Sequence, residues 1–314
     1  MKRGVARLIA LALVVTGCHS DGIAGTSGAF TLGITGHSLV VGELSRRYIL
    51  HVPAKRPVTQ AGVIRGYGLV IVLHGSSGSA ADMEATTQFD SLAEASRYVV
   101  VYAEGYSGGG GLFPSDWNAG DCCGASAREN IDDLGYIAGI IQELKGNLSI
   151  DSTRVYAAGF SDGGRMAYYL GCRMGGTFAA IAVVSGSITD SACRPARPVP
   201  LLAIHGTSDT EIPYGTDSFT PPPSIVDSTS DLPPSVQFWT AANTCSSRVD
   251  TQQAPDVLKV AFKSCPGGDV QFFRINAGQH AWPGDTGGVG SIPPMSELNA
   301  SAVISAFFVA RRRR

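Results

Sequence analysis

Short apolar runs, many of them β-branched, recur along the chain and predict strands at residues 48–52, 69–73, 98–102, 154–158, 180–184, 201–204 and 270–275. Between Leu134 and Leu144 the apolar residues fall instead at i, i+3, i+4, i+7 and i+10, which is helical spacing. Strands that are apolar throughout and alternate with helices predict a mostly parallel sheet covered on both faces. The first run, together with residues 38–41, favours an antiparallel hairpin at the sheet edge. The pattern therefore predicts an α/β fold.

Domain organisation follows from the remaining segments. We see no internal repeat and expect one catalytic domain over residues 38–310, because 314 residues suit a single α/β domain. Residues 105–111 and the Pro-rich segment 213–234 resemble loops, and we expect the second to be an insertion near the functional site. The basic residues 311–314 are interpreted mainly as a solvated tail, with contact to a membrane surface as the less favoured alternative.

The N-terminus has the layout of an export signal. Lys2, Arg3 and Arg7 accompany the apolar run 8–15, which is too short to span a membrane and is followed by Gly17 and Cys18. This arrangement resembles a bacterial lipobox, in which the cysteine is acylated. We therefore expect a lipoprotein signal at 1–18, a flexible tether at 19–37 and a location in the cell envelope. If Cys18 is instead discarded with the signal, the protein is secreted.

Bulk composition narrows the function classes. Hydrophobic residues make up 44% and charged residues 16% of the chain, which argues against disorder. The formal net charge of −2 gives no indication of nucleic-acid binding.

Six cysteines remain when Cys18 is set aside, an even number that suggests three disulfides in an exported chain. Cys245 and Cys265 bracket one short segment, so we expect them to pair. The adjacent Cys122 and Cys123 are expected to bond to separate partners, with Cys172 and Cys193 as the candidates. No CxxC or HxxxH spacing accompanies these cysteines, so no metal site is predicted.

The motif with the clearest chemistry is G-x-S-x-G at residues 159–163. It lies between the predicted strand 154–158 and a helical segment at 164–170, which is the context of a nucleophile elbow. Such a turn lifts the serine hydroxyl to the carboxyl edge of the sheet, at the N-terminus of a helix. We therefore predict that Ser161 is a nucleophile, in preference to an exposed serine in a glycine-rich turn.

A nucleophilic serine needs a base and an acid, which follow it in the order acid, histidine in this fold. His280 comes after the last predicted strand, whereas His205 ends a strand with no suitable acid before it. We predict His280 as the base and Asp209 as the acid that fixes its tautomer, with Asp190 as the alternative.

The oxyanion hole requires two backbone N–H groups. One is expected from Asp162 and the other from Ser76, in the Gly-flanked turn after strand 69–73. Trp117 and Trp282 are candidate apolar walls for a substrate, although a role in the core is equally compatible with the sequence.

With these residues in place, the chain resembles exported α/β-hydrolases comprising poly(3-hydroxybutyrate) depolymerases, feruloyl esterases and acetylxylan esterases (carbohydrate esterase family 1-like). The matching segments, spread over about 45–310, are 47–53 (RYILHVP), 73–75 (LHG), 117–120 (WNAG), 122–124 (CCG), 132–136 (DDLGY), 154–156 (RVY), 159–164 (GFSDGG), 205–209 (HGTSD), 212–214 (IPY) and 280–284 (HAWPG). The resemblance implies the same Ser161, Asp209 and His280 triad and hydrolysis without a metal or organic cofactor. Asp162 stands where the family often has Asn, which could disfavour anionic substrates.

We therefore expect a monomeric serine carboxylic ester hydrolase that acts on feruloyl or acetyl esters of plant cell-wall polysaccharide. The main alternative is a depolymerase of poly(3-hydroxybutyrate) or hydroxyalkanoate oligomers. Less favoured alternatives are an acyltransferase, a peptidase and a non-catalytic, lipid-anchored binding protein.

Overall fold

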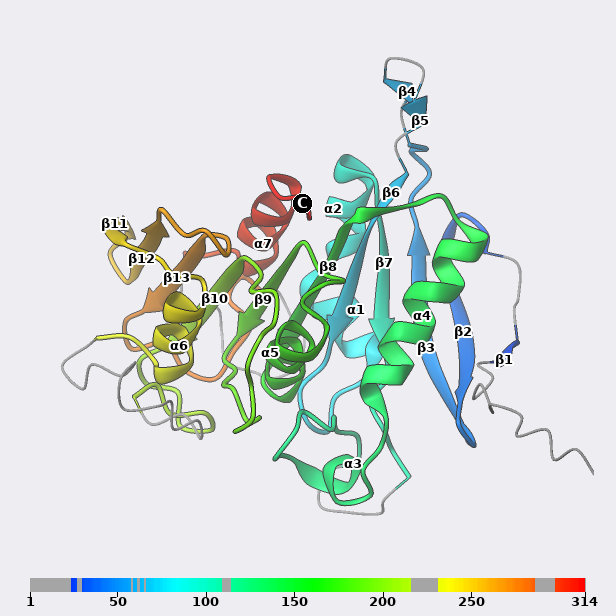
Figure 1. Cartoon of the computed structure of the whole chain (residues 1–314), viewed down its shortest axis with the longest axis horizontal. Coiled ribbons are helices and arrows are strands. Elements are labelled where there is room, and N and C mark those ends of the chain that lie inside the picture. The colour runs from blue at the N-terminus through cyan, green and yellow to red at the C-terminus, as the bar shows by residue number, and fades with distance from the viewer. Residues whose placement is uncertain are drawn as a thin grey trace, which may run out of the picture.

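The computed structural model describes residues 24–26, 30–57, 59–60, 63–64, 66–108, 114–215, 231–285 and 297–313. In these ranges eleven strands form one sheet, in the order β1 (Ala24–Thr26), β2 (Gly33–Val41), β3 (Leu44–Val52), β7 (Tyr98–Ala103), β6 (Tyr67–Leu73), β8 (Ile150–Phe160), β9 (Ala180–Val184), β10 (Leu201–Gly206), β13 (Val270–Ile275), β12 (Val257–Lys263) and β11 (Ser247–Ala254). β4 (Thr59–Gln60) and β5 (Val63–Ile64) form a separate small hairpin, visible above the sheet in Figure 1.

The centre of the sheet is parallel and its margins are antiparallel. β7, β6, β8, β9, β10 and β13 run in one direction, whereas β3 meets β7 and β12 meets β13 in antiparallel register. All seven predicted strands are present, and the β2–β3 hairpin confirms the expected antiparallel edge. β11 and β12 were not predicted. Nearly every residue of β11 is exposed and its sequence has no apolar pattern, whereas β12 is a largely apolar run that the sequence analysis did not assign.

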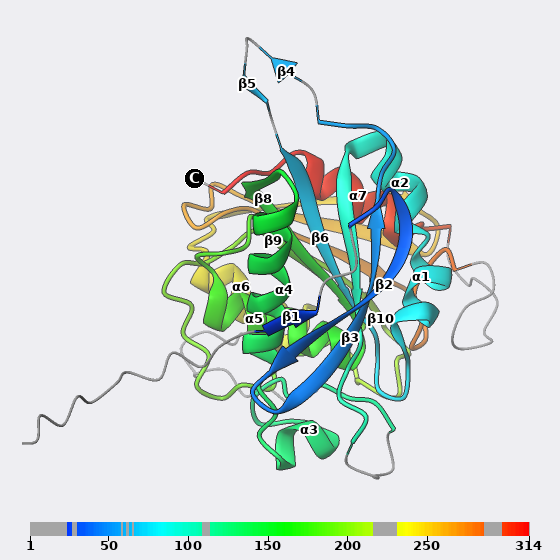
Figure 2. The same cartoon turned by 90° about the vertical axis from the view of Figure 1, so that its right-hand side faces the viewer.

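Helices cover both faces of the sheet, as Figure 2 shows. One face carries α1 (Ala80–Thr87), α2 (Phe89–Ser96) and α7 (Ala300–Val309), and the other carries α4 (Asp133–Asn147), α5 (Asp162–Met174) and α6 (Pro234–Ala242). The short α3 (Gly124–Arg128) lies beyond the edge toward which the parallel strands point (Figure 1).

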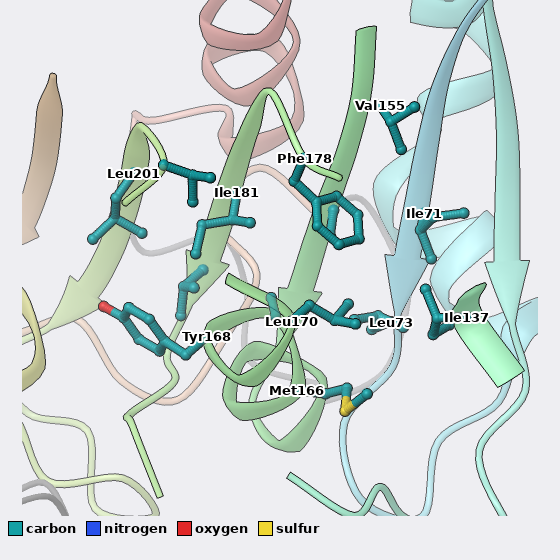
Figure 3. Close-up of a cluster of buried hydrophobic side chains, with 14 of the residues drawn as sticks. Ile71, Leu73, Ile137, Val155, Met166, Tyr168, Leu170, Phe178, Ile181 and Leu201 are labelled. Carbon is teal, nitrogen blue, oxygen red and sulfur yellow. The ribbon is translucent and has the colours of Figure 1, made fainter. Parts of the chain in front are cut away.

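Each helical layer has its own apolar core, because strands that are buried on both faces offer side chains to both sides. β6 is buried at every position, and its alternate residues enter different clusters: Ile71 and Leu73 face α4 and α5, whereas Val70 and Val72 face the α1 layer. Figure 3 shows the α5 side, where Leu170 packs among residues of the central strands.

Helix α4 was predicted from its spacing, and its buried face differs slightly from the predicted one. Ile137, Ile141 and Leu144 are buried as expected, but Ile140 takes the place of Leu134 and Ala138, which are only partly buried. The side chain of Asp132 caps the helix by accepting the Gly135 N–H, so this residue acts as a helix N-cap.

Two predicted boundaries need correction. Residues 24–26 and 33–37 fall within the expected tether, yet they belong to β1 and β2 and pair into the sheet. The tail is also less free than expected: Arg311 pairs with Asp269, Arg312 Nη1 lies 2.7 Å from Asp151 Oδ2, and the Arg313 N–H donates to the Thr153 carbonyl. The tail is therefore packed against the start of β8.

The predicted signal segment, Cys18, most of the Pro-rich insertion at 216–230 and Arg314 lie outside the described residues. Within the described ranges, no helix is both long and apolar enough to span a membrane.

Candidate active site

Ser161 occupies a sharp turn between β8 and α5. Its backbone has φ 56° and ψ −117°, a positive-φ conformation that costs a non-glycine residue about 1–3 kcal/mol. The flanking glycines make this turn possible: a Cβ on Gly159 would lie 2.0 Å from the Gly163 carbonyl oxygen, and one on Gly163 would lie 2.3 Å from that of Leu73. The G-x-S-x-G pattern is therefore a steric requirement of this local geometry.

His280 reaches Ser161 from the loop after β13. Its Nε2 lies 2.8 Å from Ser161 Oγ, and its Nδ1 lies 2.8 Å from Asp209 Oδ2. Because the Asp209 carboxylate accepts, Nδ1 carries the proton and Nε2 presents a lone pair to the serine hydroxyl. The His280 side chain is 9% exposed and that of Asp209 0%, so these hydrogen bonds are largely shielded from water.

Asp209 is held ionised by a set of donors in the turn after β10. Burial by itself would raise its pKa, but hydrogen bonds from His205, His280 and the Ile212 N–H hold the pKa well below its usual range. Oδ1 accepts from the Glu211 and Ile212 N–H groups at 3.0 and 2.9 Å. A permanently ionised carboxylate fixes the imidazole tautomer that a base requires.

The alternative histidine and acid lie elsewhere. His205 Nε2 is 2.8 Å from the Ile212 carbonyl oxygen and 3.3 Å from Asp209 Oδ2. This ring therefore contacts the predicted acid and not Ser161. Asp190 instead accepts from Arg173 Nη2 at 2.8 Å. The structure thus brings Ser161, His280 and Asp209 together and leaves the two alternatives in supporting or separate positions.

The turn after β6 lies against the serine. A Cβ on Gly75 would be 3.0 Å from Ser161 Cβ, so the absence of a side chain allows this close approach. The backbone N–H groups of Ser76 and Asp162 donate to no acceptor within the described residues, which leaves both available to a ligand. These are the two amides predicted for an oxyanion site.

His74 fixes the conformation of this turn, a role that the sequence analysis did not assign. The Gly105 N–H donates to Nε2 at 2.8 Å, so Nδ1 carries the proton and donates to the Gly75 carbonyl at 2.7 Å. Burial lowers the pKa of His74, which keeps the ring neutral and this tautomer in place. The only sequence signal was its position directly before Gly75.

The Asp162 carboxyl, next to Ser161 in the chain, is fully buried. Its Oδ2 accepts the Trp117 N–H at 2.9 Å, and burial raises its pKa to about 7 against that hydrogen bond. Oδ1 is buried and has no hydrogen-bond partner. Asp162 therefore links the elbow to the loop at Trp117, and its charge is only partly developed at neutral pH.

Trp117 and Trp282 belong to the core. Their exposed fractions are 0% and 3%, and each contributes to one of the two apolar clusters. Trp117 Nε1 donates to the His74 carbonyl and Trp282 Nε1 to Ser301 Oγ, so both indole N–H groups are satisfied internally. The suggestion that these side chains line a substrate pocket is therefore replaced by the core alternative.

The disulfides confirm one predicted pair and correct the other. Cys245 pairs with Cys265 as expected. Cys172 pairs with Cys193, and the adjacent Cys122 and Cys123 pair with each other rather than with separate partners. The physical reason is proximity: Cys172 and Cys193, 5.4 Å apart at Cα, are already partnered in the packed α5 layer. Among the described residues, no group of three or more His, Cys, Asp or Glu side chains is arranged to hold a metal ion.

Sequence comparisons relate this chain to esterases. Residues 49–206 match the family described as Esterase PHB depolymerase. The putative esterase NocK of Nocardia uniformis subsp. tsuyamanensis is 29% identical over 272 residues, which cover 80% of this chain and 75% of that protein. Feruloyl esterase B of Piromyces equi is 30% identical over 223 residues, covering 68% of this chain but only 39% of that esterase.

Solved structures show the same architecture. An acetyl xylan esterase from Aspergillus awamori superimposes with a TM-score of 0.53 at 14% identity, covering 75% of this chain and 89% of that one. An S-formylglutathione hydrolase from Agrobacterium tumefaciens gives a TM-score of 0.54 at 13% identity, covering 92% and 96%. At such identities the likeness concerns the fold, which is that of the α/β-hydrolases.

Proposed function

Because this chain belongs to the Esterase PHB depolymerase family and is a carboxylic ester hydrolase, we propose that Ser161, His280 and Asp209 form its catalytic triad. The observation that carries the proposal is the pair of 2.8 Å hydrogen bonds that join the three side chains in the order serine, histidine, aspartate. The three residues come from turns after β8, β10 and β13, so the parallel strands deliver them to one edge of the sheet.

In the first half-reaction, Ser161 Oγ attacks the ester carbonyl carbon while His280 Nε2 takes the hydroxyl proton. The carbonyl π electrons move to oxygen, where the Ser76 and Asp162 N–H groups donate to the developing oxyanion. Collapse of this intermediate expels the alkoxide, which leaves as an alcohol with the proton from His280. Water then repeats the sequence on the acyl-enzyme and releases the carboxylic acid and Ser161.

The decisive test is Ser161→Ala. Loss of the nucleophile should reduce kcat toward the uncatalysed background, a fall of about a million-fold in a comparable triad. Labelling by a fluorophosphonate should disappear with it. Ser152→Ala is the matched control, because Ser152 is exposed at the opposite end of β8. Retained ester turnover in the Ser161 variant would show that the nucleophile lies elsewhere.

For the substrate, we favour feruloyl or acetyl esters of plant cell-wall polysaccharide, supported by the names of relatives such as the Piromyces equi feruloyl esterase B. Hydroxyalkanoate oligomers are the second candidate, favoured by the family description. A panel of methyl ferulate, acetylated xylan and a hydroxybutyrate trimer separates the two. Preferred turnover of the first two substrates supports the cell-wall function, and preferred turnover of the trimer supports the second candidate.

The protein is proposed to work outside the cytoplasm. Three disulfides support this location, since such bonds persist mainly in oxidising compartments.

A further inference from the structure

Arg165 lies one helical turn beyond Ser161. Its backbone N–H donates to the Ser161 carbonyl at 3.0 Å, so the two residues are about 6 Å apart along the axis of α5. Helical side chains lean toward the N-terminus of their helix, which directs Arg165 toward the edge of the sheet that carries Ser161. The Arg165 side chain is 18% exposed, whereas its neighbours Gly164 and Met166 are buried.

The positive charge of Arg165 is poorly compensated. Nη1 contacts the sulfur atoms of the disulfide, at 2.9 Å to Cys123 and 3.6 Å to Cys122, and these atoms carry no charge. Within the described residues its only ion-pair partner is Asp162, whose Oδ1 lies 3.8 Å from Arg165 Nη1. That carboxyl has its pKa raised by burial to about 7, so it is only partly ionised at neutral pH.

One arm of the guanidinium is free to bind. Nη2 donates to no acceptor in the described part of the chain and, unlike Nε, it is not sealed from solvent. A free guanidinium N–H is a strong partner for a carboxylate, because the hydrogen bond between them is charge-assisted.

A negative charge lies near the other side of the triad. Glu211 is 70% exposed, and its Oε2 lies 3.7 Å from His280 Nε2, the atom that faces the serine. Glu211 follows β10, whereas Arg165 belongs to α5, so the two charges approach Ser161 from different elements. An ester with a negatively charged end is therefore repelled near Glu211 and attracted near Arg165.

We propose that Arg165 forms a binding subsite for the free carboxylate of monoanionic esters, and that Glu211 opposes binding of such esters in the reverse orientation. The proposal rests on the triad proposed above. Because Arg165 is one helical turn from Ser161, the substrate class is an ester whose carboxylate is on a short linker from the scissile carbonyl, on either the acyl or the alcohol portion. Half-esters of dicarboxylic acids and short hydroxy-acid oligomers with a free carboxyl end have this chemistry.

The test compares pairs of esters in which one member carries a terminal carboxylate and the other a neutral group. Monomethyl adipate and methyl hexanoate place a carboxylate or a methyl group at the end of a six-carbon acyl chain. The linear hydroxybutyrate dimer and its primary amide place a carboxylate or a neutral amide on the alcohol portion while keeping a single ester bond. The readout is the ratio of kcat/KM for the anionic ester to that for the neutral one. This ratio cancels any general effect of a substitution on the fold or the triad.

Arg165→Met should lower the ratio about tenfold in at least one pair, the loss expected for one charge-assisted hydrogen bond. Arg165→Lys should keep most of the ratio, and Glu211→Gln should raise it several-fold. Arg312→Met removes a positive charge at the opposite end of β8 and should leave the ratio unchanged. An unchanged ratio for Arg165→Met in both pairs would overturn the subsite. Failure of the triad is distinguishable, because Ser161→Ala would then retain turnover of the neutral esters.

Discussion

Replacing Asp162 by Asn tests whether a buried negative charge beside Ser161 lowers the thermal stability of the protein. The carboxyl is buried beside the nucleophile, and only one of its two oxygens has a hydrogen-bond partner. Asn keeps an oxygen that can accept the Trp117 N–H but cannot ionise. The substitution therefore removes a buried charge while it preserves the shape of the side chain and its hydrogen bond.

The magnitude follows from the pKa of this group. Burial raises the pKa of Asp162 from 3.8 to about 7 in the folded protein. The unfolded chain thus ionises first, so the folded state loses stability as pH rises from about 4 to about 7. A difference of about three pKa units corresponds to about 4 kcal/mol when the loss is complete. Rearrangement around the charge will reduce this value, and we expect the Asp162→Asn variant to be more stable than the parent by about 2–4 kcal/mol at pH 8.

Thermal unfolding at pH 5, 6, 7 and 8 measures the effect. The variant and the parent should have similar Tm values at pH 5, and the variant should be higher by about 5 °C at pH 8. Asp121→Asn is the control: hydrogen bonds from Ser191 lower the pKa of Asp121, so its contribution changes only below this pH range. A Tm difference for Asp162→Asn that stays constant from pH 5 to 8 would refute the buried-charge explanation.

Two further predictions concern the turn and the N-terminus. Gly163→Ala should abolish activity and lower the yield of folded protein, because its Cβ would lie 2.3 Å from the Leu73 carbonyl oxygen, whereas Gly146→Ala has open space and should be neutral or slightly stabilising. Circular dichroism and ester turnover of both variants check this; an active Gly163 variant would contradict the steric argument. Cys18→Ser should move the protein from the detergent phase to the aqueous phase on Triton X-114 partitioning if Cys18 carries the acyl anchor, and unchanged partitioning would exclude that anchor.

Local sequence patterns were sufficient for the strands and for the elbow. β6, β7 and β9 are buried throughout, so their apolar runs leave little ambiguity about their place in the centre of a parallel sheet. The elbow was recognisable because close backbone contacts demand glycine at fixed distances from Ser161. Chain order then selected His280 and Asp209, since each follows a predicted strand of a fold with a known order of residues.

Edge elements escaped prediction for a physical reason. β11 is exposed along almost its whole length, so nothing in its polarity distinguishes it from a loop. Its position is determined by backbone hydrogen bonds to β12. These bonds depend on how the fold places the two strands and not on a pattern of side chains. The same holds for residues 33–37, which have a composition suited to a tether but pair with β3.

The sequence by itself determined the fold class, the order along the chain of the turns that carry the chemistry, and the identity of Ser161, Asp209 and His280, whose side chains meet in the structure. Tertiary structure decided what depends on distances between segments: the pairing of Cys122 with Cys123, the burial of Trp117 and Trp282, and the approach of Arg165 to that disulfide. The periodicity of apolar residues reflects the environment of a single helix or strand. These contacts instead join different segments, and the distance between two segments along the chain does not predict their distance in space.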